Sequence, residues 1–323
     1  MSRAPVDQRP SVVHLIRAGT LDAELAALAW LMLEARVPLI VASASGPGDR
    51  ATVVSALLEF LPQTAVVRHL EGGTETFAWL PEALRLGWRA PGPGRGAESP
   101  ALAAGAESLA LAAGAESPAL AAGAESLALA AGADRISSAN GYLVAGQLGV
   151  GDQRSTWGEP ARIAIRALSI GYGLGATVEA ASLEDLFERL GRPDVSLTAD
   201  ELSHLGMVLI LRAFRGEQDD AIPRIAAAHY IRPVSRDSGG HLQRLRPAVL
   251  ATWDEGAGSF EHFAWGVTPE LAMRVGRRAG DFEAELERRR DVLSALAAAG
   301  LESSSDVRSA IDGYRLALAP HRH

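Results

Sequence analysis

The sequence predicts an α/β protein with a mainly parallel sheet, plus a small C-terminal subdomain of β-hairpins and helices. Short apolar runs alternate with segments whose apolar residues recur at helical spacing, the pattern of a parallel sheet covered by helices. One such run, LIVA at 39–42, enters a helix through a glycine-containing turn, as a parallel α/β unit begins. The 323 residues are 48% hydrophobic and 22% charged, so the chain can build a sizeable core.

The individual elements follow from apolar runs and from residues that begin or end helices. Leu25, Leu28 and Leu31 share one face of a first helix, which we expect Thr20 to cap and Pro38 to end. Strands are expected at 39–42, 65–70, 142–147, 175–180 and 207–212. Further helices are expected at 53–61, 162–171 and 183–190, the last with Ser182 as its cap.

The character of the sequence changes after residue 228. The turns DSGG and DEGAGS separate strand-like runs, and residues 269–299 and 305–318 have the pattern of polar amphipathic helices. Residues 229–323 are therefore predicted to form the C-terminal strands and helices. Trp253 and Trp265 flank the second turn and are expected to pack this region.

A repeated segment interrupts the α/β pattern. The units GAESPALAA and GAESLALAA alternate without a gap over 96–131. A glycine inside a helix costs about 1 kcal/mol and a proline about 3 kcal/mol, so one continuous helix is not expected. We interpret 96–132 as a tolerated surface insertion. It separates a first part of the core, 1–95, from a second part, 133–228.

Composition excludes several functions. The net charge of −8 argues against nucleic-acid binding, which needs a basic surface. There is no Cys, so thiolate catalysis is excluded. All 31 basic residues are Arg, which excludes every mechanism that uses a Lys amine. The eight His show no metal-ligand spacing. The apolar residues 21–42 carry too many charges for a membrane span, so a cytoplasmic protein is expected.

The turn SASGPGDRAT at 43–52 lies where a phosphate-binding loop would lie. Such a loop reads G-x-x-x-x-G-K-[ST] between a strand and a helix, and its N–H groups bind phosphate. Gly48 fits the second glycine, whereas Ser43 replaces the first, Asp49 the lysine and Arg50 the hydroxyl residue. The candidate nucleotide contacts are Ser45, Gly46, Gly48, Asp49, Arg50 and Ala51.

Asp49 places a negative charge where phosphate oxygens would bind. A charge-assisted hydrogen bond to lysine, worth roughly 1.5–3 kcal/mol, is replaced by repulsion. Arg50 can compensate in part, but it offers no hydroxyl for magnesium. ATP and Mg²⁺ are therefore the candidate cofactors, and whether they bind stays open.

The order of segments resembles that of a known family. The segments LIRAGTLDAELAALAWLMLEARVPLIVAS, VVRHLEGGTETFAWLP, YLVAGQL and GATVEAASLEDLFERL resemble the secretion ATPases, the P-loop motors of type II and type IV secretion, type IV pili and archaella. The likeness covers about residues 12–265 apart from the repeats. It implies a RecA-like P-loop NTPase core, a hexamer, and partners among secretion or pilus membrane components, which would place the protein at the inner face of the membrane.

The resemblance also assigns motif residues. Glu71 and Glu75 in HLEGGTE resemble the family's acidic box, although a solvated acidic turn is an equal alternative. YLVAGQL resembles the Walker B strand, with Gln147 where the family has the Glu that handles the attacking water. ATVEAAS resembles the histidine box, with Glu179 in the histidine position. Glu71, Glu75, Gln147 and Glu179 are the candidate catalytic residues.

Three hypotheses follow. In the first, the chain is a degenerate member with impaired or lost ATP hydrolysis and a structural or regulatory role, as a homo-oligomer or beside an active paralogue. In the second, it is an active ATPase whose site is rewired through Arg50 and Glu71 or Glu75. In the third, it is a non-motor α/β scaffold. Arg162 and Arg166 could reach a neighbouring subunit, but solvent-facing charges are favoured, and the run 288–290 is interpreted as a solvated helix face.

Overall fold

The computed structural model describes residues 10–44, 49–89, 135–215, 221–236 and 239–318. The chain forms two compact units, which we describe separately: 1–75 with 138–323, and 76–137. The repeats predicted as an insertion, and the loop residues Ser45, Gly46 and Gly48, lie outside the described residues.

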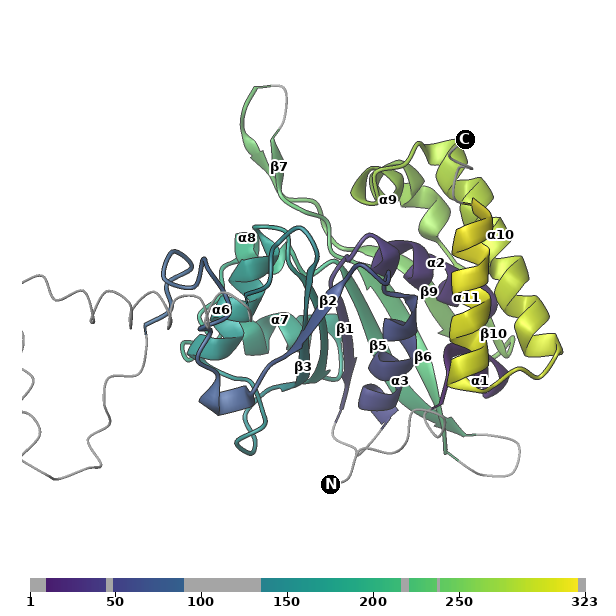
Figure 1. Cartoon of the computed structure of the whole chain (residues 1–323), viewed down its shortest axis with the longest axis horizontal. Helices are drawn as coiled ribbons and strands as arrows, with labels where there is room; N and C mark the ends of the chain where they lie inside the picture. Colours follow the sequence, from purple (N-terminus) through teal and green to yellow (C-terminus); the bar gives the residue numbers. More distant parts are fainter. Residues whose placement is uncertain (1–9, 45–48, 90–134, 216–220, 237–238, 319–323) are drawn as a thin grey trace, which may run out of the picture. The chain divides into compact units, whose positions relative to one another are not determined.

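The larger unit contains one eight-stranded sheet in the order β10-β9-β6-β5-β1-β4-β3-β2 (Figure 1). Its pairings from β5 to β2 are parallel, whereas those from β5 to β10 are antiparallel. The α/β class with a mostly parallel sheet is confirmed, and the arrangement is compatible with a RecA-like core. The strands are β1 (Leu39–Ser43), β2 (Val66–His69), β3 (Gly141–Leu148), β4 (Gly173–Glu179), β5 (Met207–Arg215), β6 (Ala221–Tyr230), β9 (Ala248–Asp254) and β10 (Ser259–His262).

Strand β1 lies inside the sheet. Ile40 is opposite Ala176 of β4 on one side and Val208 of β5 on the other. The four residues of LIVA are 0% exposed. A parallel strand that is covered on both faces needs apolar residues without alternation, which explains why this run was recognisable in the sequence.

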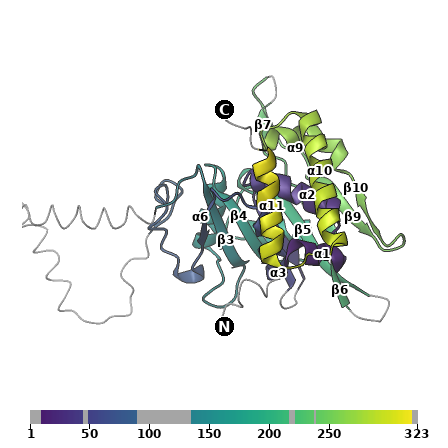
Figure 2. The same ribbon diagram turned by 45° about the vertical axis from the view of Figure 1, so that its right-hand side comes forward.

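Helices cover both faces of the sheet (Figures 1 and 2). From β1 to β2 the chain moves in one direction across the sheet, and from β2 through β3 and β4 to β5 it moves back. Parallel crossovers are right-handed, so helices in the two directions lie on opposite faces. One layer contains α1 (Val12–Arg17), α2 (Ala23–Glu34), α3 (Asp49–Leu57), α10 (Ala279–Ala298) and α11 (Ser304–Leu318); the other contains α6 (Glu159–Leu168), α7 (Leu183–Gly191) and α8 (Ala199–Leu202).

The N-cap residues of α7 and α2 can be compared with the predicted ones. Ser182 accepts a hydrogen bond from the N–H of Asp185 and caps α7, as predicted. The prediction for α2 was wrong, because Asp22 is its cap and accepts from the N–H of Leu25 at 2.9 Å. Thr20 is 1% exposed and precedes the cap by two residues. An Asp at the cap also stabilises the positive end of the helix.

The strands after residue 228 continue the main sheet. β9 pairs with β6 and β10 pairs with β9, and the short helices η4 (Ala264–Val267) and α9 (Thr268–Arg274) follow. The strands β7 (Ser235–Arg236) and β8 (Leu242–Gln243) form a separate hairpin that projects from this unit in both ribbon views. Trp253 packs on Phe260, as predicted. Trp265 does not pack, since it is 77% exposed.

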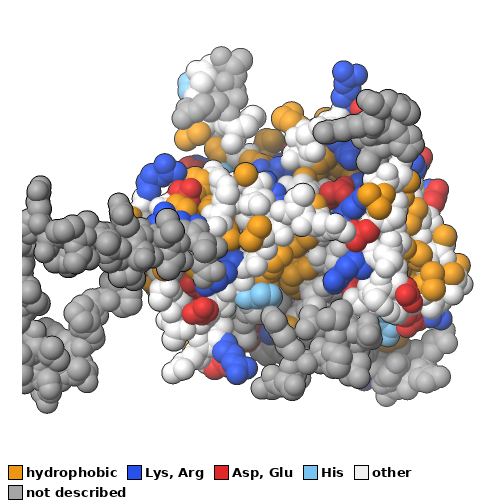
Figure 3. All heavy atoms as spheres, viewed as in Figure 1, with side chains coloured by type: hydrophobic (Ala, Val, Ile, Leu, Met, Phe, Trp, Pro, Cys, Tyr) orange, Lys and Arg blue, Asp and Glu red, His pale blue; other side chains and the backbone are white. Residues whose placement is uncertain are grey.

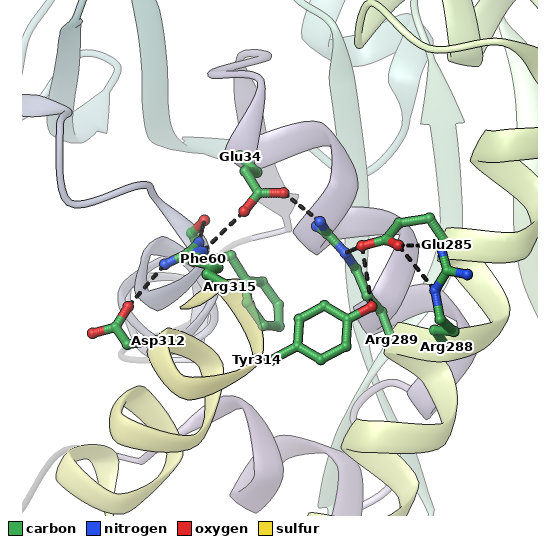
Figure 4. Close-up of polar contacts among 8 residues, drawn as sticks. All are labelled: Glu34, Phe60, Glu285, Arg288, Arg289, Asp312, Tyr314 and Arg315. Carbon is green, nitrogen blue, oxygen red and sulfur yellow. Dashed lines mark hydrogen bonds and ion pairs between the residues drawn. The ribbon is translucent and has the colours of Figure 1, made fainter. Parts of the chain in front are cut away.

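A buried ion network joins the C-terminal helices to α2 (Figure 4). Arg289 of α10 pairs with Glu285, and both side chains are 1% exposed. Arg289 also pairs with Glu34 of α2, and Arg315 of α11 reaches the same carboxylate at 2.9 Å. The interpretation of 288–290 as a solvated face was therefore wrong for Arg289. Charges can be buried here because each one is paired.

The smaller unit is described for residues 76–89 and 135–137. Its aromatic side chains form a small cluster in which Phe77 lies 5.6 Å from Trp79 and 4.9 Å from Trp88, measured between ring centroids. The N–H of Ile136 donates to the carbonyl oxygen of Trp79, which closes the unit across the repeats. In the larger unit the remaining short helices are η2 (Leu58–Phe60) and η3 (Gly72–Thr74).

Candidate functional site at the carboxyl ends of the parallel strands

The strand order defines where a ligand site is expected. β1 and β4 are neighbours in the sheet. From β1 the chain passes over β4 to reach β2 at the edge, whereas from β4 it passes over β1 to reach β5. Open α/β sheets bind ligands beyond the carboxyl ends of strands at such a switch point. Ser43 and Glu179, which end β1 and β4, are directly opposite each other. The loop that resembles a phosphate-binding loop leaves from this point.

Arg50 lies in the first turn of α3 and bonds to the strand ends. Its Nη1 donates to the carbonyl oxygen of Ser43 at 2.9 Å, and it lies 3.3 Å from Ser43 Oγ and 3.4 Å from the carbonyl oxygen of Val178. The guanidinium therefore compensates the negative ends of peptide groups in β1 and β4. Ala51, the next residue, is exposed.

Gln147 and Glu179 lie together at this edge of the sheet. They line a cavity of about 130 Å³ with Trp157, Arg189 and Arg192. Arg189 also pairs with Asp185, one turn earlier in α7, at 2.7 Å. The cavity thus combines one carboxylate, one amide and two guanidinium groups. It could bind a small polar or anionic group, and Gln147 could orient water, but an amide cannot accept a proton from it.

An irregularity in β3 sets the position of Gln147. The β3–β4 register shifts between Ala145 and Leu148, so Gln147 lies in a bulge rather than in the regular ladder. Thr177 of β4 donates its hydroxyl to the carbonyl oxygen of Gly146 next to it. Bulges at sheet ends redirect side chains, and this one carries Gln147 to the cavity.

The two residues of the predicted acidic box lie at the far edge of the parallel part. β2 is separated from β1 by β3 and β4, which is about 14 Å at the usual strand spacing. Glu75 is 3% exposed and accepts from the N–H of Glu71 at 2.9 Å, so it stabilises its own turn. The Glu71 side chain is 58% exposed and lies 3.6 Å from Arg68. The structure does not bring either carboxylate beside Arg50.

Arg162 and Arg166 are held within the chain. Arg162 donates to the carbonyl oxygen of Val195 at 2.6 Å, and Arg166 pairs with Glu201 at 2.6 Å. Sequence reasoning missed Trp157, Arg189 and Arg192, which line the cavity. Only Arg189 had a usable signal, its i,i+4 spacing from Asp185 on the helix that Ser182 caps.

Within the described residues, no group of three or more His, Asp or Glu side chains could hold a metal ion. A search of the same residues finds no helix long and apolar enough to cross a membrane. On the face drawn in Figure 3, acidic, basic and apolar side chains are interspersed over the described part.

These features define an α/β protein with a polar cavity at the carboxyl ends of β3 and β4, next to the switch point of a mostly parallel sheet. Comparison with known protein families finds no family model that matches the chain, and no curated protein is similar enough in sequence to count as a relative.

Proposed function

We propose that this chain is a secretion-ATPase-like protein that has a structural or regulatory role and little or no ATP hydrolysis. The observation that carries the proposal is the position of Arg50. Its guanidinium bonds to main-chain oxygens at the ends of β1 and β4, so its charge already serves the fold. Binding phosphate instead would cost these contacts, while the neighbouring Asp49 would repel it.

The other candidate groups support the same proposal. Phosphoryl transfer depends on positioning and on charge stabilisation around the transferred group. Gln147 has no basic oxygen to accept a proton, and Glu179 shares its cavity with Arg189 and Arg192. Glu75 is bound within its own turn. Glu71 and Glu75 follow β2, which β3 and β4 separate from β1 and Arg50.

Nucleotide binding and turnover test this proposal. The full chain is titrated with a fluorescent ATP analogue with and without Mg²⁺, and phosphate release is followed in parallel. We expect phosphate release equal to that of Gln147→Ala, the matched control for background hydrolysis. Magnesium-dependent release that Arg50→Ala abolishes would contradict the proposal and support a rewired ATPase with Arg50 and Glu71 or Glu75.

The oligomeric state of the protein distinguishes this proposal from the non-motor scaffold. The resemblance predicts a ring, formed with other copies or with an active paralogue, at the inner face of a membrane beside secretion or pilus components. We expect sedimentation to detect a hexamer at high protein concentration. A monomer or dimer at every concentration, together with no incorporation into the paralogue's ring, would favour the scaffold.

A further inference from the structure

A second hollow of about 280 Å³ lies in the larger unit, away from the strand ends described above. Its acidic lining comes from Glu24, near the start of α2, and from Glu283 and Glu287 on α10. Phe282 and Leu286, from the same part of α10, give it an apolar lining. Acidic and apolar groups at one helix face are complementary to a ligand that is both cationic and apolar.

The charges around this hollow favour a cation. Of the two lining groups that can carry positive charge, His262 lies 2.7 Å from Asp22 and 3.7 Å from Glu24. Burial lowers the pKa of His262, but the hydrogen bond and charge of Asp22 and the charge of Glu24 outweigh it, so its pKa is raised. Arg290 pairs with Asp291 at 3.1 Å. The hydrogen bond to Asp291 raises the pKa of Arg290, and the charges of Glu24 and Glu287 add to that effect. The lining still has three carboxylates against these two cations, and Glu283 and Glu287 lie on the exposed side of α10.

An exposed aromatic side chain borders the same hollow. Trp265 lines it and is 77% exposed. Trp265 is the most exposed of the six tryptophans, all of which lie in the described residues. A tryptophan face attracts guanidinium and ammonium groups, more strongly once water is excluded. An exposed aromatic side chain beside carboxylates and apolar helix residues suits the side chains of a basic amphipathic peptide.

We propose that this hollow binds a basic amphipathic segment of a partner protein. An arginine or lysine of that segment lies between Glu283, Glu287 and Trp265, and an apolar neighbour packs on Leu286. The volume is just below the roughly 300 Å³ at which small-molecule pockets begin, which fits inserted side chains better than a whole metabolite. Three carboxylates line the hollow, so a segment that carries positive charge is complementary to it. The inference is independent of the proposed ATP chemistry.

A labelled synthetic peptide tests the site. The probe is a 16-residue helical peptide with Arg on one face and Leu on the other, and its control carries Glu in place of Arg. Fluorescence anisotropy with the full chain at low salt is expected to show binding of the Arg peptide only. The double substitution Glu283→Gln/Glu287→Gln should weaken binding about tenfold, or about 1.4 kcal/mol, because it removes two of the carboxylates that attract the peptide. Trp265→Ala should weaken it by about threefold or more.

Glu188→Gln is the matched control for charge, because Glu188 is an exposed glutamate on α7, away from the hollow. Circular dichroism confirms that each variant is folded. Equal binding of the Arg and Glu peptides, or equal weakening by Glu188→Gln and the double substitution, would overturn the proposal. Self-association that the double substitution abolishes would also overturn it, because the occupant would then be a second copy.

Discussion

Arg50 donates a hydrogen bond of 2.9 Å from Nη1 to the main-chain oxygen of Ser43, which ties the first turn of α3 to the end of β1. The same nitrogen lies 3.4 Å from the carbonyl oxygen of Val178 in β4. Two neighbouring strand ends are therefore held by one cation at the point where a phosphate-binding loop would bind its ligand. The end of β1, the end of β4 and the first turn of α3 are thus joined by one side chain.

Loss of the Arg50 side chain is expected to destabilise the protein. Arg50→Ala removes charge-assisted hydrogen bonds at a partly buried site, and we expect the free energy of unfolding to fall by about 1–3 kcal/mol. Urea unfolding followed by circular dichroism measures the change. Arg277→Ala, at an exposed arginine, is the control and should cost less than about 0.5 kcal/mol. Equal losses in the two variants would show that Arg50 does not hold the strand ends.

A lysine at position 49 is expected to increase the affinity for nucleotide. Asp49→Lys replaces a repulsive charge by an attractive one, and we expect the ATP analogue to bind about tenfold more tightly or better. Asp49→Asn is the control, because it removes the repulsion without adding a cation, and its gain should be smaller. If both variants bind as weakly as the original protein, Asp49 is not what prevents binding. Fluorescence titration with Mg²⁺ provides the measurement.

The buried pair Arg289–Glu285 is expected to contribute far more to stability than the exposed pair Arg290–Asp291. Arg289→Met removes the buried cation that Glu285 and Glu34 share. Among the described residues, Glu285 then keeps only Arg288 and the Tyr314 hydroxyl, and Glu34 keeps only Arg315. Breaking a buried pair costs about 3–5 kcal/mol. Arg290→Met, on the same helix, breaks only an exposed pair worth about 1 kcal/mol or less.

Urea unfolding of the two variants gives the comparison. The double substitution Glu285→Gln/Arg289→Met removes one carboxylate together with its cation. It should be less destabilising than Arg289→Met alone. If the double substitution lowers the free energy of unfolding by the sum of the two single effects, the two side chains do not interact.

Glu59 is expected to make stability depend on pH. Burial raises the pKa of Glu59 above its ordinary value of 4.5, against the smaller lowering effect of its hydrogen bond from Ser304. A raised carboxyl pKa means that the folded protein binds the proton more tightly than the unfolded chain. The resulting stability is present below pH 4.5 and is lost as the pH rises through the folded pKa.

Glu59→Gln tests this dependence, because glutamine keeps an oxygen that accepts from Ser304 but carries no charge to bury. We expect the variant to be more stable than the original protein at pH 7, with a difference that shrinks as the pH falls toward 4.5. Unfolding curves at several pH values measure it. Glu188→Gln, at an exposed site, should show no such trend. A difference that grows as the pH falls would contradict the assignment.

Much of the fold was predictable because it depends on local patterns. The run LIVA is buried on both faces of a parallel strand, so it is apolar without alternation, and it was recognisable as a strand. Ser182 begins α7 as its sequence context indicates. The cap of α2 was misassigned because Thr20 and Asp22 are both good caps, and the backbone path decides between them.

The candidate site was only partly predictable. Gln147 and Glu179 lie far apart in the sequence and share a cavity because β3 and β4 are neighbours in the sheet. Trp157, Arg189 and Arg192 join them through the packing of α7 and the loop after β3, which no local pattern encodes. Glu71 and Glu75 follow β2, and their distance from Arg50 depends on where β2 lies in the strand order.

The sequence by itself determined the class of fold, the five parallel strands and the absence of lysine and cysteine chemistry, because composition and short-range periodicity carry that information. Only the tertiary structure decided the environment of each charge. Arg289 and Arg290 are adjacent and identical in sequence, yet one is buried against Glu285 and the other is exposed, because α2 covers one face of α10. Likewise, Trp253 is packed and Trp265 is exposed beside an acidic hollow. Burial and pairing arise from contacts between distant segments, so they are properties of the fold.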